Sequence, residues 1–324
     1  MIPVPPQLLT FIHEGNRFLI AGHREPDGDC VGSQLALASA LGRLGKETVL
    51  CSAGPFRRTE ILPWKDRFAA QVPDSLRAGA RVIITDCGAL ERTGDLRPFL
   101  EGLPLAVIDH HAVSPEDPGS GAVLFLDPGA PAAAVMVLSL IEALGLSPSP
   151  EEAEAIFFGL CTDTGFFRHL DSRGAGAFRH AAALVEAGAD PKRTYHAMYG
   201  GKSLGARQLA GIVLARAESH YGGRLIVSWE NYGETREYGA GGRDSDAVYQ
   251  LLMSVGGVEA VAVIRQESPE KCAIGLRSRD RVDVGQVARH FGGGGHKNAA
   301  GASVPGTIPE ILSQTIDAFK EELL

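Results

Sequence analysis

Short, strongly apolar segments that run into aspartate or histidine are the feature that most constrains this chain. Residues 17–21, 81–85 and 105–108 are apolar or β-branched along almost their whole length. Strands without polar alternation lie buried on both faces, as in parallel sheets covered by helices. Further segments of this kind span residues 47–51 and 122–126, and residues 31–44, 131–146, 150–162 and 174–188 are typical of helices. The alternation predicts an α/β fold with a parallel sheet.

A second block of different character begins near residue 200, where Tyr199-Gly200-Gly201-Lys202-Ser203 interrupts the pattern. Beyond it we predict strands at 224–229, 258–265 and 271–277, and helices near 204–218, 245–254, 283–290 and 308–322. A length of 324 residues also suits two domains. We therefore expect an N-terminal domain over 1–195, a linker over 196–206 and a smaller mixed α/β domain over 207–324.

Charge and cysteine content exclude several classes of protein. The formal net charge is −8, so no extended positive surface attracts long nucleic acid. Phosphate must then be held by local basic groups, metal ions or backbone N–H groups. The five cysteines form no CxxC pair, which is typical of reduced intracellular thiols. Since neither a signal peptide nor ~18 consecutive apolar residues occur, we predict a cytoplasmic protein without membrane association.

Acidic residues and histidines follow the predicted strands, where ligands bind in an open parallel sheet. The first strand leads into residues 23–29 (HREPDGD), the second into Asp86 and the third into Asp109-His110-His111, while Asp163 follows the helix 150–162. A single aspartate at such a position usually caps a helix or forms a turn. Several carboxylates at one edge of a sheet, however, repel one another unless cations neutralise them.

The chemistry of these side chains indicates the kind of cation. Imidazoles and carboxylates without paired thiolates favour Mn²⁺, then iron or cobalt, over a zinc site with three ligands. Six or more ligands indicate two ions that share a bridging carboxylate. Two ions ~3.5–4 Å apart generate a hydroxide that attacks phosphorus and bind both oxygens of the displacement. The residues by themselves predict a binuclear metallohydrolase that acts on phosphate esters.

Four segments resemble the motifs of the DHH phosphoesterase superfamily: HREPDGDCVGS (23–33), TDCGALER (85–92), VIDHHAV (107–113) and GLCTDTGFFR (159–168). Residues 276–301 (LRSRDRVDVGQVARHFGGGGHKNAAG) are similar to the superfamily's associated C-terminal domain with its GGGH signature. Length and motifs most resemble the bacterial nanoRNase/pAp-phosphatase group. Members of that group degrade very short oligonucleotides and dephosphorylate 3′-phosphoadenosine-5′-phosphate.

The resemblance implies two Mn²⁺ ions per chain, with Mg²⁺, Co²⁺ or Fe²⁺ as substitutes. One ion is expected on His23 and Asp27, the other on Asp29, His110 and Asp163, with Asp86 bridging the two. His111 is expected to face the scissile phosphate, where it stabilises charge or protonates the leaving oxygen. Asp109 is expected to orient a histidine ligand through its ring N–H group.

Substrate contacts are expected from both domains, with the active site in the cleft between them. In the C-terminal domain the resemblance implies a nucleotide anchor formed by Arg277, Ser278, Arg279, Gly294, Gly295 and His296. In the N-terminal domain we expect contacts from Ser33 and Arg92. Capping chemistry for Ser33 and a solvated charge for Arg92 remain open as alternatives.

The resemblance therefore implies an Mn²⁺-dependent phosphoesterase that hydrolyses short oligoribonucleotides and 3′-phosphoadenosine-5′-phosphate. A phosphodiesterase of cyclic or linear signalling dinucleotides stays open, as does a catalytically silent nucleotide sensor. The complete set of ligand residues argues against the sensor. The expected partners are short RNA or DNA fragments and nucleotides, with no obligate protein partner; whether the protein forms a homodimer stays open.

Overall fold

The computed structural model describes residues 2–111, 121–279 and 281–323. The chain divides into two compact units, Met1–Gly200 and Gly201–Leu324. Of the motifs named above, residues 112–113 and 280 lie outside the described residues. No helix in the described part is long and apolar enough to cross a bilayer.

The first unit is built on a five-stranded parallel sheet with the strand order β2-β1-β3-β4-β5. The strands are β1 (Arg17–Ala21), β2 (Glu47–Cys51), β3 (Ala80–Thr85), β4 (Leu105–Asp109) and β5 (Val123–Leu126). All five lie within one residue of the predicted ranges at either end, because each is a short apolar run between turn residues. The predicted α/β class with a parallel sheet is confirmed.

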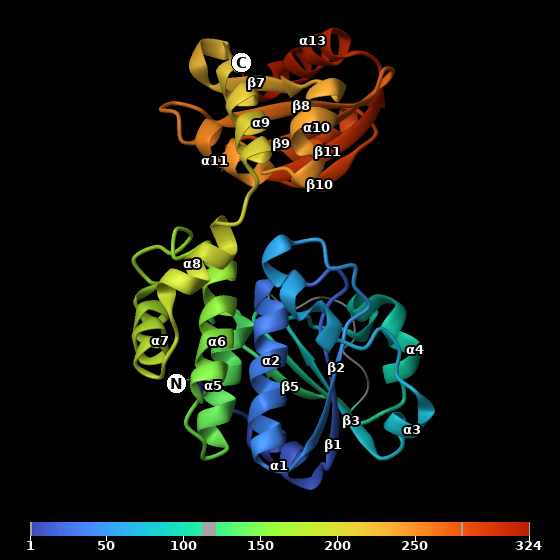
Figure 1. Ribbon diagram of the computed structural model, residues 1–324, viewed down its shortest axis with the longest axis vertical. Helices are drawn as coiled ribbons and strands as arrows, with labels where there is room; N and C mark the ends of the chain where they lie inside the picture. Colours follow the sequence, from blue (N-terminus) through green and yellow to red (C-terminus); the bar gives the residue numbers. More distant parts are fainter. Residues whose placement is uncertain (1, 112–120, 280, 324) are drawn as a thin grey trace. The chain divides into compact units, whose positions relative to one another are not determined.

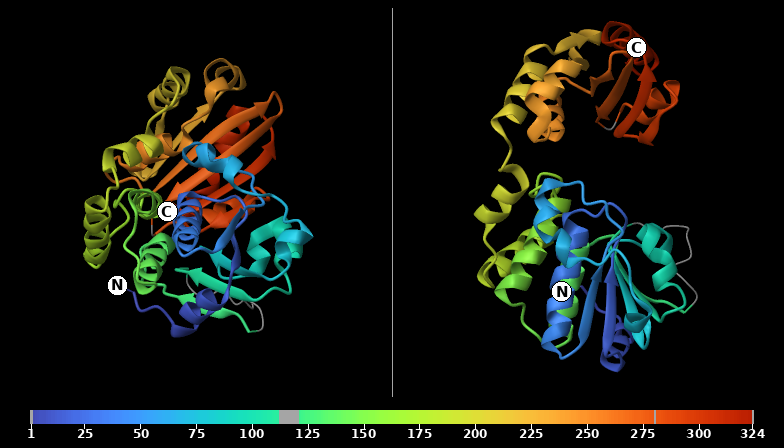
Figure 2. Two further views of the ribbon diagram at one scale, coloured as in Figure 1. Left: turned by 60° about the horizontal axis from the view of Figure 1, so that its bottom comes forward. Right: turned by 45° about the vertical axis from the view of Figure 1, so that its right-hand side comes forward.

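Both faces of this sheet are buried, since alternate residues of each strand enter different cores. Phe18 and Ile20 of β1 pack with helices on one face, whereas Leu19 and Ala21 enter a second core on the other face. Helices α2 (Gly28–Arg43), α5 (Ala133–Ala143) and α6 (Pro150–Asp163) supply the first layer. The short helices α3 (Asp74–Arg77) and α4 (Arg97–Leu100) lie on the opposite side (Figure 1). The right-hand view of Figure 2 shows the strands running between these layers.

Further helices complete the first unit. They are α1 (Pro6–Glu14), α7 (Ala175–Glu186) and α8 (Pro191–Tyr199), with 3₁₀ segments at Thr59–Arg67 and Leu90–Leu96. Neither α1 nor α8 is predicted from the sequence, and α8 occupies residues assigned in part to the linker. Asp190 caps α8 by accepting hydrogen bonds from the backbone of Lys192 and Arg193, and Pro191 opens the helix.

The second unit contains a six-stranded mixed sheet with the order β10-β11-β9-β8-β7-β6. Its strands are β6 (Glu218–His220), β7 (Leu225–Glu230), β8 (Ala260–Ser268), β9 (Lys271–Ser278), β10 (Gly294–His296) and β11 (Ala299–Pro305). Only β7 and β8 pair in parallel; the other neighbours are antiparallel. This mixed sheet confirms the fold predicted for the C-terminal domain.

Helices pack on both faces of the second sheet. Helices α9 (Leu204–Ala215) and α11 (Ser245–Met253) cover β7 and β8 on one face. Helices α12 (Val284–His290), α13 (Ile308–Ala318) and α14 (Lys320–Leu323) close the core on the other. The helix α10 (Tyr232–Tyr238) and 3₁₀ turns at Tyr221–Gly223 and Gly239–Gly241 make up the rest. The helix predicted near 204–218 ends at Ala215, because residues 218–220 form the edge strand β6.

Candidate metal centre and active site

Polar side chains from three strands and two helices converge at the carboxyl edge of the first sheet. The His110 Nε2 atom lies 3.5 Å from Asp86 Oδ1, 3.6 Å from Asp163 Oδ2 and 3.8 Å from Asp29 Oδ2. The His23 Nε2 atom lies 3.4 Å from Asp86 Oδ2 and 3.8 Å from Asp27 Oδ1. All six residues expected to hold metal are therefore brought together, with Asp86 between the two histidines.

Both histidines are oriented by backbone carbonyl groups. His23 Nδ1 lies 2.8 Å from the carbonyl oxygen of Arg24, and His110 Nδ1 lies 3.2 Å from that of Ala130. A carbonyl can only accept, so each Nδ1 donates a proton to its carbonyl and each Nε2 faces the carboxylates. A hydrogen bond from the far ring nitrogen is the usual support of a metal-binding histidine.

Asp27 and Asp29 each hold a helix as well as facing the cluster. The Asp27 carboxylate accepts from the backbone N–H groups of Asp29 and Cys30 and so caps α2. Asp29, with 1% of its surface exposed, accepts from Ala133 N at 2.7 Å and from Ala134 N at 2.9 Å. Since α5 has no side-chain cap within its own segment, Asp29 of α2 supplies one.

Close packing of α2 on α6 sets the position of Asp29. A Cβ atom added at Gly159 would stand 2.7 Å from Ala134 Cβ and 2.9 Å from Asp29 Oδ1. One added at Gly32 would stand 2.4 Å from the Ala155 carbonyl oxygen. Glycine at both positions lets the helix backbones approach closely enough for Asp29 and Asp163 to meet His110. The sequence alone does not show that Gly159 lies at this close approach.

Asp86 has left-handed backbone geometry, with a φ of 61°, immediately after β3. Aspartate tolerates this region better than most residues, and such strain gathers at functional sites. The Asp86 N–H group donates to the Ile108 carbonyl of β4 at 2.9 Å, which holds the turn in place. The turn directs the 2%-exposed carboxylate between His23 and His110.

The charges of the cluster lie close together and shift the pKa values of its side chains. Burial, with the charges of Asp86 and Asp163, raises the pKa of Asp29 well above its ordinary value. Burial and the Asp86 charge raise the pKa of Asp163 to about 6, although His110 opposes the shift. Burial lowers the pKa of the two histidines, but their carboxylate partners outweigh it. The pKa of His23 rises to about 10, and that of His110 to about 9.

The cluster fits divalent cations. The His110 Nε2 atom is buried and has no hydrogen-bond partner among the described residues, although it faces three carboxylates. Buried carboxylates around an imidazole nitrogen without a partner fit a divalent cation, which would neutralise the carboxylates and bind the nitrogen. Candidate donor atoms lie within 4.8 Å of one another in three groups: His23, Cys30 and Asp86; Asp86, His110 and His111; and Asp29, His110 and Asp163. Asp86 belongs to two of the groups, as a bridging ligand must.

Cys30 is in the first of these groups, although the sequence does not suggest it as a ligand. Burial raises the pKa of the Cys30 thiol well above its usual range. Asp27 is in none of the three groups, since its carboxylate reaches the cluster only through His23.

His111 differs from the other two histidines. Its Nδ1 atom lies 2.7 Å from Asp109 Oδ1, and its side chain is 44% exposed. The hydrogen bond to Asp109 raises the pKa of His111, while the pKa of Asp109 is lowered because bonding to His111 outweighs its burial. The prediction that Asp109 orients a histidine ligand is wrong in detail, because Asp109 pairs with His111 and a carbonyl orients His110. Paired in this way, His111 presents its Nε2 atom away from Asp109.

Ser33 and Arg92 lie in different surroundings in the first unit. Ser33 is fully buried, and its hydroxyl donates to Asp29 Oδ1 at 3.4 Å. The expected contact of Ser33 with substrate is therefore wrong; its hydroxyl supports Asp29. Arg92 is exposed in the 3₁₀ segment Leu90–Leu96, where its carbonyl accepts from the Arg24 N–H group.

The residues expected to anchor a nucleotide gather at one side of the second sheet. Arg277 of β9 pairs with Ala299 of β11, which pairs with His296 of β10. Paired residues point to the same face, so Arg277 and His296 share one face with small residues between them. The glycine run, which would usually be a flexible loop, continues into β10 because Gly294 and Gly295 pair with Gly301 and Ala300.

Two other members of this anchor are held by the protein itself. The Ser278 hydroxyl lies 2.7 Å from the Val282 carbonyl and 3.2 Å from that of Lys297, so it ties β9 to the segment after His296. The Arg279 guanidinium donates to the Met253 carbonyl at 2.6 Å. Both side chains are therefore bonded within the unit and shape the anchor. Of its other polar side chains, Arg277 is half-buried and His296 is exposed.

Two family models match the chain. The DHH family, N-terminal domain, matches residues 17–160, and the DHHA1 domain matches residues 222–323. These ranges contain most of the residues described in this site. Asp163 lies just beyond the first range.

Individual proteins with similar sequences or structures point to the same family as the two models. The chain is 32% identical to the bifunctional oligoribonuclease and PAP phosphatase NrnA of Thermus thermophilus, over 94% of this chain and 89% of that protein. The crystal structure of an exopolyphosphatase-related protein from Bacteroides fragilis has a TM-score of 0.83 at 25% identity, covering 98% and 96% of the two chains. RecJ of Thermus thermophilus, in complex with Mn²⁺, shares the fold at a TM-score of 0.53 and 17% identity, over 98% of this chain and 55% of RecJ. The chain therefore belongs to the DHH family, as a hydrolase of phosphate esters that carries a DHHA1 domain after its DHH domain.

Proposed function

We propose that this protein hydrolyses short oligoribonucleotides to mononucleotides, and 3′-phosphoadenosine-5′-phosphate to AMP, with two Mn²⁺ ions per chain. The observation that carries the proposal is the buried His110 Nε2 atom, unpartnered among the described residues and facing three carboxylates. The similarity to a relative named for both activities, over nearly the whole of each chain, supports this choice of substrates.

The donor set suits manganese. His23 and Asp27 would hold one ion, Asp29, His110 and Asp163 the other, and Asp86 would contribute one oxygen to each. Mixed imidazole and carboxylate ligands favour Mn²⁺ over a zinc site, which takes fewer carboxylates. Bound there, the two cations supply Lewis acidity and make a water molecule more acidic near neutral pH.

Proton transfer falls to His111. Because Asp109 accepts from Nδ1, the His111 Nε2 atom is left for the substrate. The raised pKa of His111 keeps the ring protonated at higher pH than an isolated imidazole. Nε2 then gives a proton to the leaving oxygen of the ester, and Asp109 stabilises the charged ring before that transfer.

Substrate length is limited by charge. The net charge of −8 provides no long cationic track, and the single anchor on the second unit binds one end of a nucleotide chain. Arg277 and His296 are proposed to contact a phosphate there, with Gly294 and Gly295 placing backbone N–H groups at the same edge. Arg92 remains a proposed contact from the first unit.

A comparison of substrates tests the proposal. The purified full chain with Mn²⁺ is given a dinucleotide, a five-mer, a thirty-mer, 3′-phosphoadenosine-5′-phosphate and a cyclic dinucleotide, and kcat/KM is measured for each. We expect the highest values for the dinucleotide and 3′-phosphoadenosine-5′-phosphate and a steep fall with length. A preference for the cyclic dinucleotide would indicate a signalling phosphodiesterase instead. Equal values for the two-mer and thirty-mer would indicate a processive exonuclease.

A further inference from the structure

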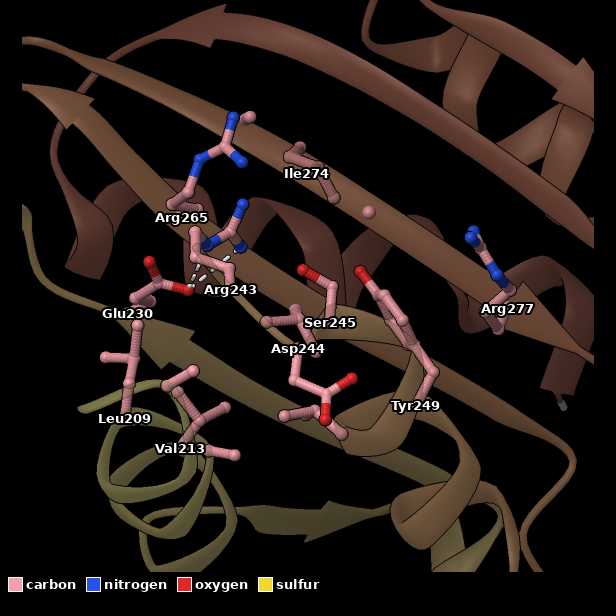
Figure 3. A pocket seen from close by; sticks show the side chains of 16 residues that line it. Leu209, Val213, Glu230, Arg243, Asp244, Ser245, Tyr249, Arg265, Ile274 and Arg277 are labelled. Atoms are coloured by element: carbon pink, nitrogen blue, oxygen red, sulfur yellow. Dashed lines mark hydrogen bonds and ion pairs between the residues drawn. The ribbon is translucent and has the colours of Figure 1, made fainter. Parts of the chain in front are cut away.

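Arg58 of the first unit lies beside the carboxylate cluster with its hydrogen-bond donors unused. Its Nη2 atom lies 3.8 Å from Asp27 Oδ2, and no hydrogen bond from the guanidinium is found among the described residues. A separation of 3.8 Å joins two charges but is too wide for a hydrogen bond. Arg243 of the second unit shows the contrast, since it donates to Glu230 at 3.2 and 2.9 Å along the dashed lines of Figure 3. Arg58 therefore keeps its N–H donors for a ligand.

The backbone that carries Arg58 is fixed on both sides of this residue. Before it, the Gly54 carbonyl accepts from the Glu25 N–H group at 2.9 Å, which joins the segment to the loop after β1. After it, Ile61 of the 3₁₀ segment Thr59–Arg67 is fully buried in the core. The Arg58 side chain itself is 54% exposed. The packed backbone places Arg58 at the cluster, while its guanidinium stays accessible to a ligand.

The charge of Arg58 does not support the proposed metal ligands. A positive charge beside a cation site repels the ions that bind there. Asp27 is held without Arg58, because its carboxylate accepts from the backbone N–H groups of Asp29 and Cys30. Among the ion pairs of the described residues, that of Arg58 is the one that brings a lysine or arginine to a carboxylate of the cluster. An anion bound beside the metal ions is what a positive charge at this place favours.

We propose that Arg58 binds the substrate phosphate at the metal centre and favours phosphate monoesters over diesters. A monoester phosphate has three terminal oxygens and carries nearly two negative charges above pH ~6. A diester phosphate has two terminal oxygens and one negative charge. The additional oxygen and charge of the monoester match a guanidinium group, which binds phosphate oxygens in a fixed geometry.

This inference rests on the proposed function and deepens it. Removal of the 3′-phosphate from 3′-phosphoadenosine-5′-phosphate is hydrolysis of a monoester, whereas cleavage of an oligoribonucleotide is hydrolysis of a diester. Arg58 thus sets the preference of one metal centre between these two substrates.

Replacing Arg58 should separate the two activities. For the full chain with Mn²⁺ at pH 7.5, kcat/KM is measured with 3′-phosphoadenosine-5′-phosphate and with a dinucleotide. In Arg58→Gln we expect the value for the monoester to fall by about 10–100-fold, as when a hydrogen bond to a charged group is lost. The value for the dinucleotide should fall by less than about fivefold, as for an exposed charge without a contact. Arg58→Lys keeps the charge without the planar group and should retain more monoesterase activity than Arg58→Gln.

The matched control is Arg57→Gln, which removes the same charge one residue earlier. Arg57 pairs with Glu25 and not with the cluster. Its replacement should change both kcat/KM values by less than about twofold. Equal losses for the two substrates in Arg58→Gln, or the same monoester loss in Arg57→Gln, would overturn the inference, since either result shows a general attraction of anions. An unchanged monoester value in Arg58→Gln would overturn it as well.

Two further measurements distinguish a phosphate contact from support of Asp27. Bound manganese in Arg58→Gln should be at least that of the unchanged protein, because a repelling charge is removed. Inorganic phosphate, titrated into the manganese-loaded full chain by isothermal titration calorimetry, should bind Arg58→Gln about 10-fold more weakly and Arg57→Gln with unchanged affinity. Lower manganese content with unchanged phosphate affinity in Arg58→Gln would assign Arg58 to the support of Asp27 and overturn the inference.

Failure of the proposed function would give a different pattern. Hydrolysis of neither substrate by the unchanged protein would overturn the proposed function, while weaker phosphate binding by Arg58→Gln would still support the Arg58 contact. Hydrolysis of both substrates with no effect of Arg58→Gln would leave the proposed function standing and remove the contact.

Discussion

At the scale of single residues, the pairing of His111 with Asp109 distinguishes His111 from the two histidines that are proposed to bind cations. His111 is half-exposed and bonded through Nδ1 to Asp109, whereas His23 and His110 are bonded through Nδ1 to backbone carbonyls. Three histidines of one cluster are thus set in place by two kinds of partner. The sequence shows that the three histidines are present but not which atom each one presents.

Replacing His111 should therefore affect rate without affecting metal content. His111→Ala is expected to lower kcat by about 10²–10⁴-fold, the usual contribution of a positioned acid. Bound manganese, measured by inductively coupled plasma mass spectrometry, should stay at the level of the unchanged protein. The exposed His13→Ala serves as the control and should alter neither quantity. Loss of metal in His111→Ala would instead make His111 a ligand.

Replacing Asp86 should have the opposite pattern. Asp86→Asn preserves a side chain that tolerates a φ of 61° but removes the charge placed between His23 and His110. We expect it to lose most bound manganese and essentially all turnover, as measured by the same metal analysis and by dinucleotide hydrolysis. Full metal content with retained activity would contradict a shared carboxylate.

The pKa shifts of the histidines predict how metal binding depends on pH. In the metal-free protein the pKa of His23 is raised to about 10 and that of His110 to about 9, so both rings are protonated at pH 7.5. Manganese needs the neutral rings, so its binding must release these two ring protons, together with any proton held by Asp29, whose pKa is also raised. The apparent affinity should therefore rise with pH between 6 and 9. Calorimetry in HEPES and in Tris, whose ionisation enthalpies differ, counts the protons; an affinity independent of pH would contradict the assignment.

At the scale of secondary structure, an element could be predicted when its own residues carry the pattern of a strand or helix. The strands β1 and β2 have the predicted bounds, because apolar runs between turn residues carry their own signal. Helix α2 begins at Gly28, three residues before its predicted start, because Asp27 caps a segment that resembles a turn. The strand β10 was not predicted, since Gly294–His296 becomes a strand only by pairing with β11. The residues gathered at the candidate site could be named by resemblance, whereas the closeness of α2 and α6 could not be predicted.

That closeness can be tested at Gly159. Gly159→Ala places a methyl group 2.7 Å from Ala134 Cβ and 2.9 Å from Asp29 Oδ1. We expect the free energy of unfolding to fall by about 1–3 kcal/mol, as for other overpacked cores, and the affinity for manganese to fall as Asp29 is displaced. Gly42→Ala is a matched control near the end of α2, where nothing lies within 4 Å, and it should be neutral or stabilising by up to about 1 kcal/mol. Denaturant unfolding and a manganese titration measure both effects.

At the scale of the whole molecule, metal is expected to stabilise only one of the two units. Each has its own buried cores, and every proposed metal ligand lies between residues 23 and 163, within the first unit. A ligand that binds only the folded form raises the stability of the part that binds it. Metal should therefore act on one half of the chain.

Calorimetry of the full chain tests this division. We expect two unfolding transitions, because chains with two domains often depart from two-state behaviour. Adding Mn²⁺ should raise the Tm of one transition by several degrees and leave the other within about one degree, and EDTA should reverse the change. Asp86→Asn should abolish the shift. Equal shifts of both transitions would contradict a metal site confined to the first unit.

The capping of α5 by Asp29 has a consequence for reading sequences related to this one. Asp29 holds the start of a buried helix, and Asp27 holds the start of another, so selection for folding alone would retain both after catalysis had been lost. The Asp163 carboxylate caps no helix in the described part of the chain, where it faces His110. A descendant that had become a passive binder of nucleotides would thus keep Asp27 and Asp29 and drift first at Asp163. Presence of aspartate at position 163 is the sharper sign that a relative still works as an enzyme.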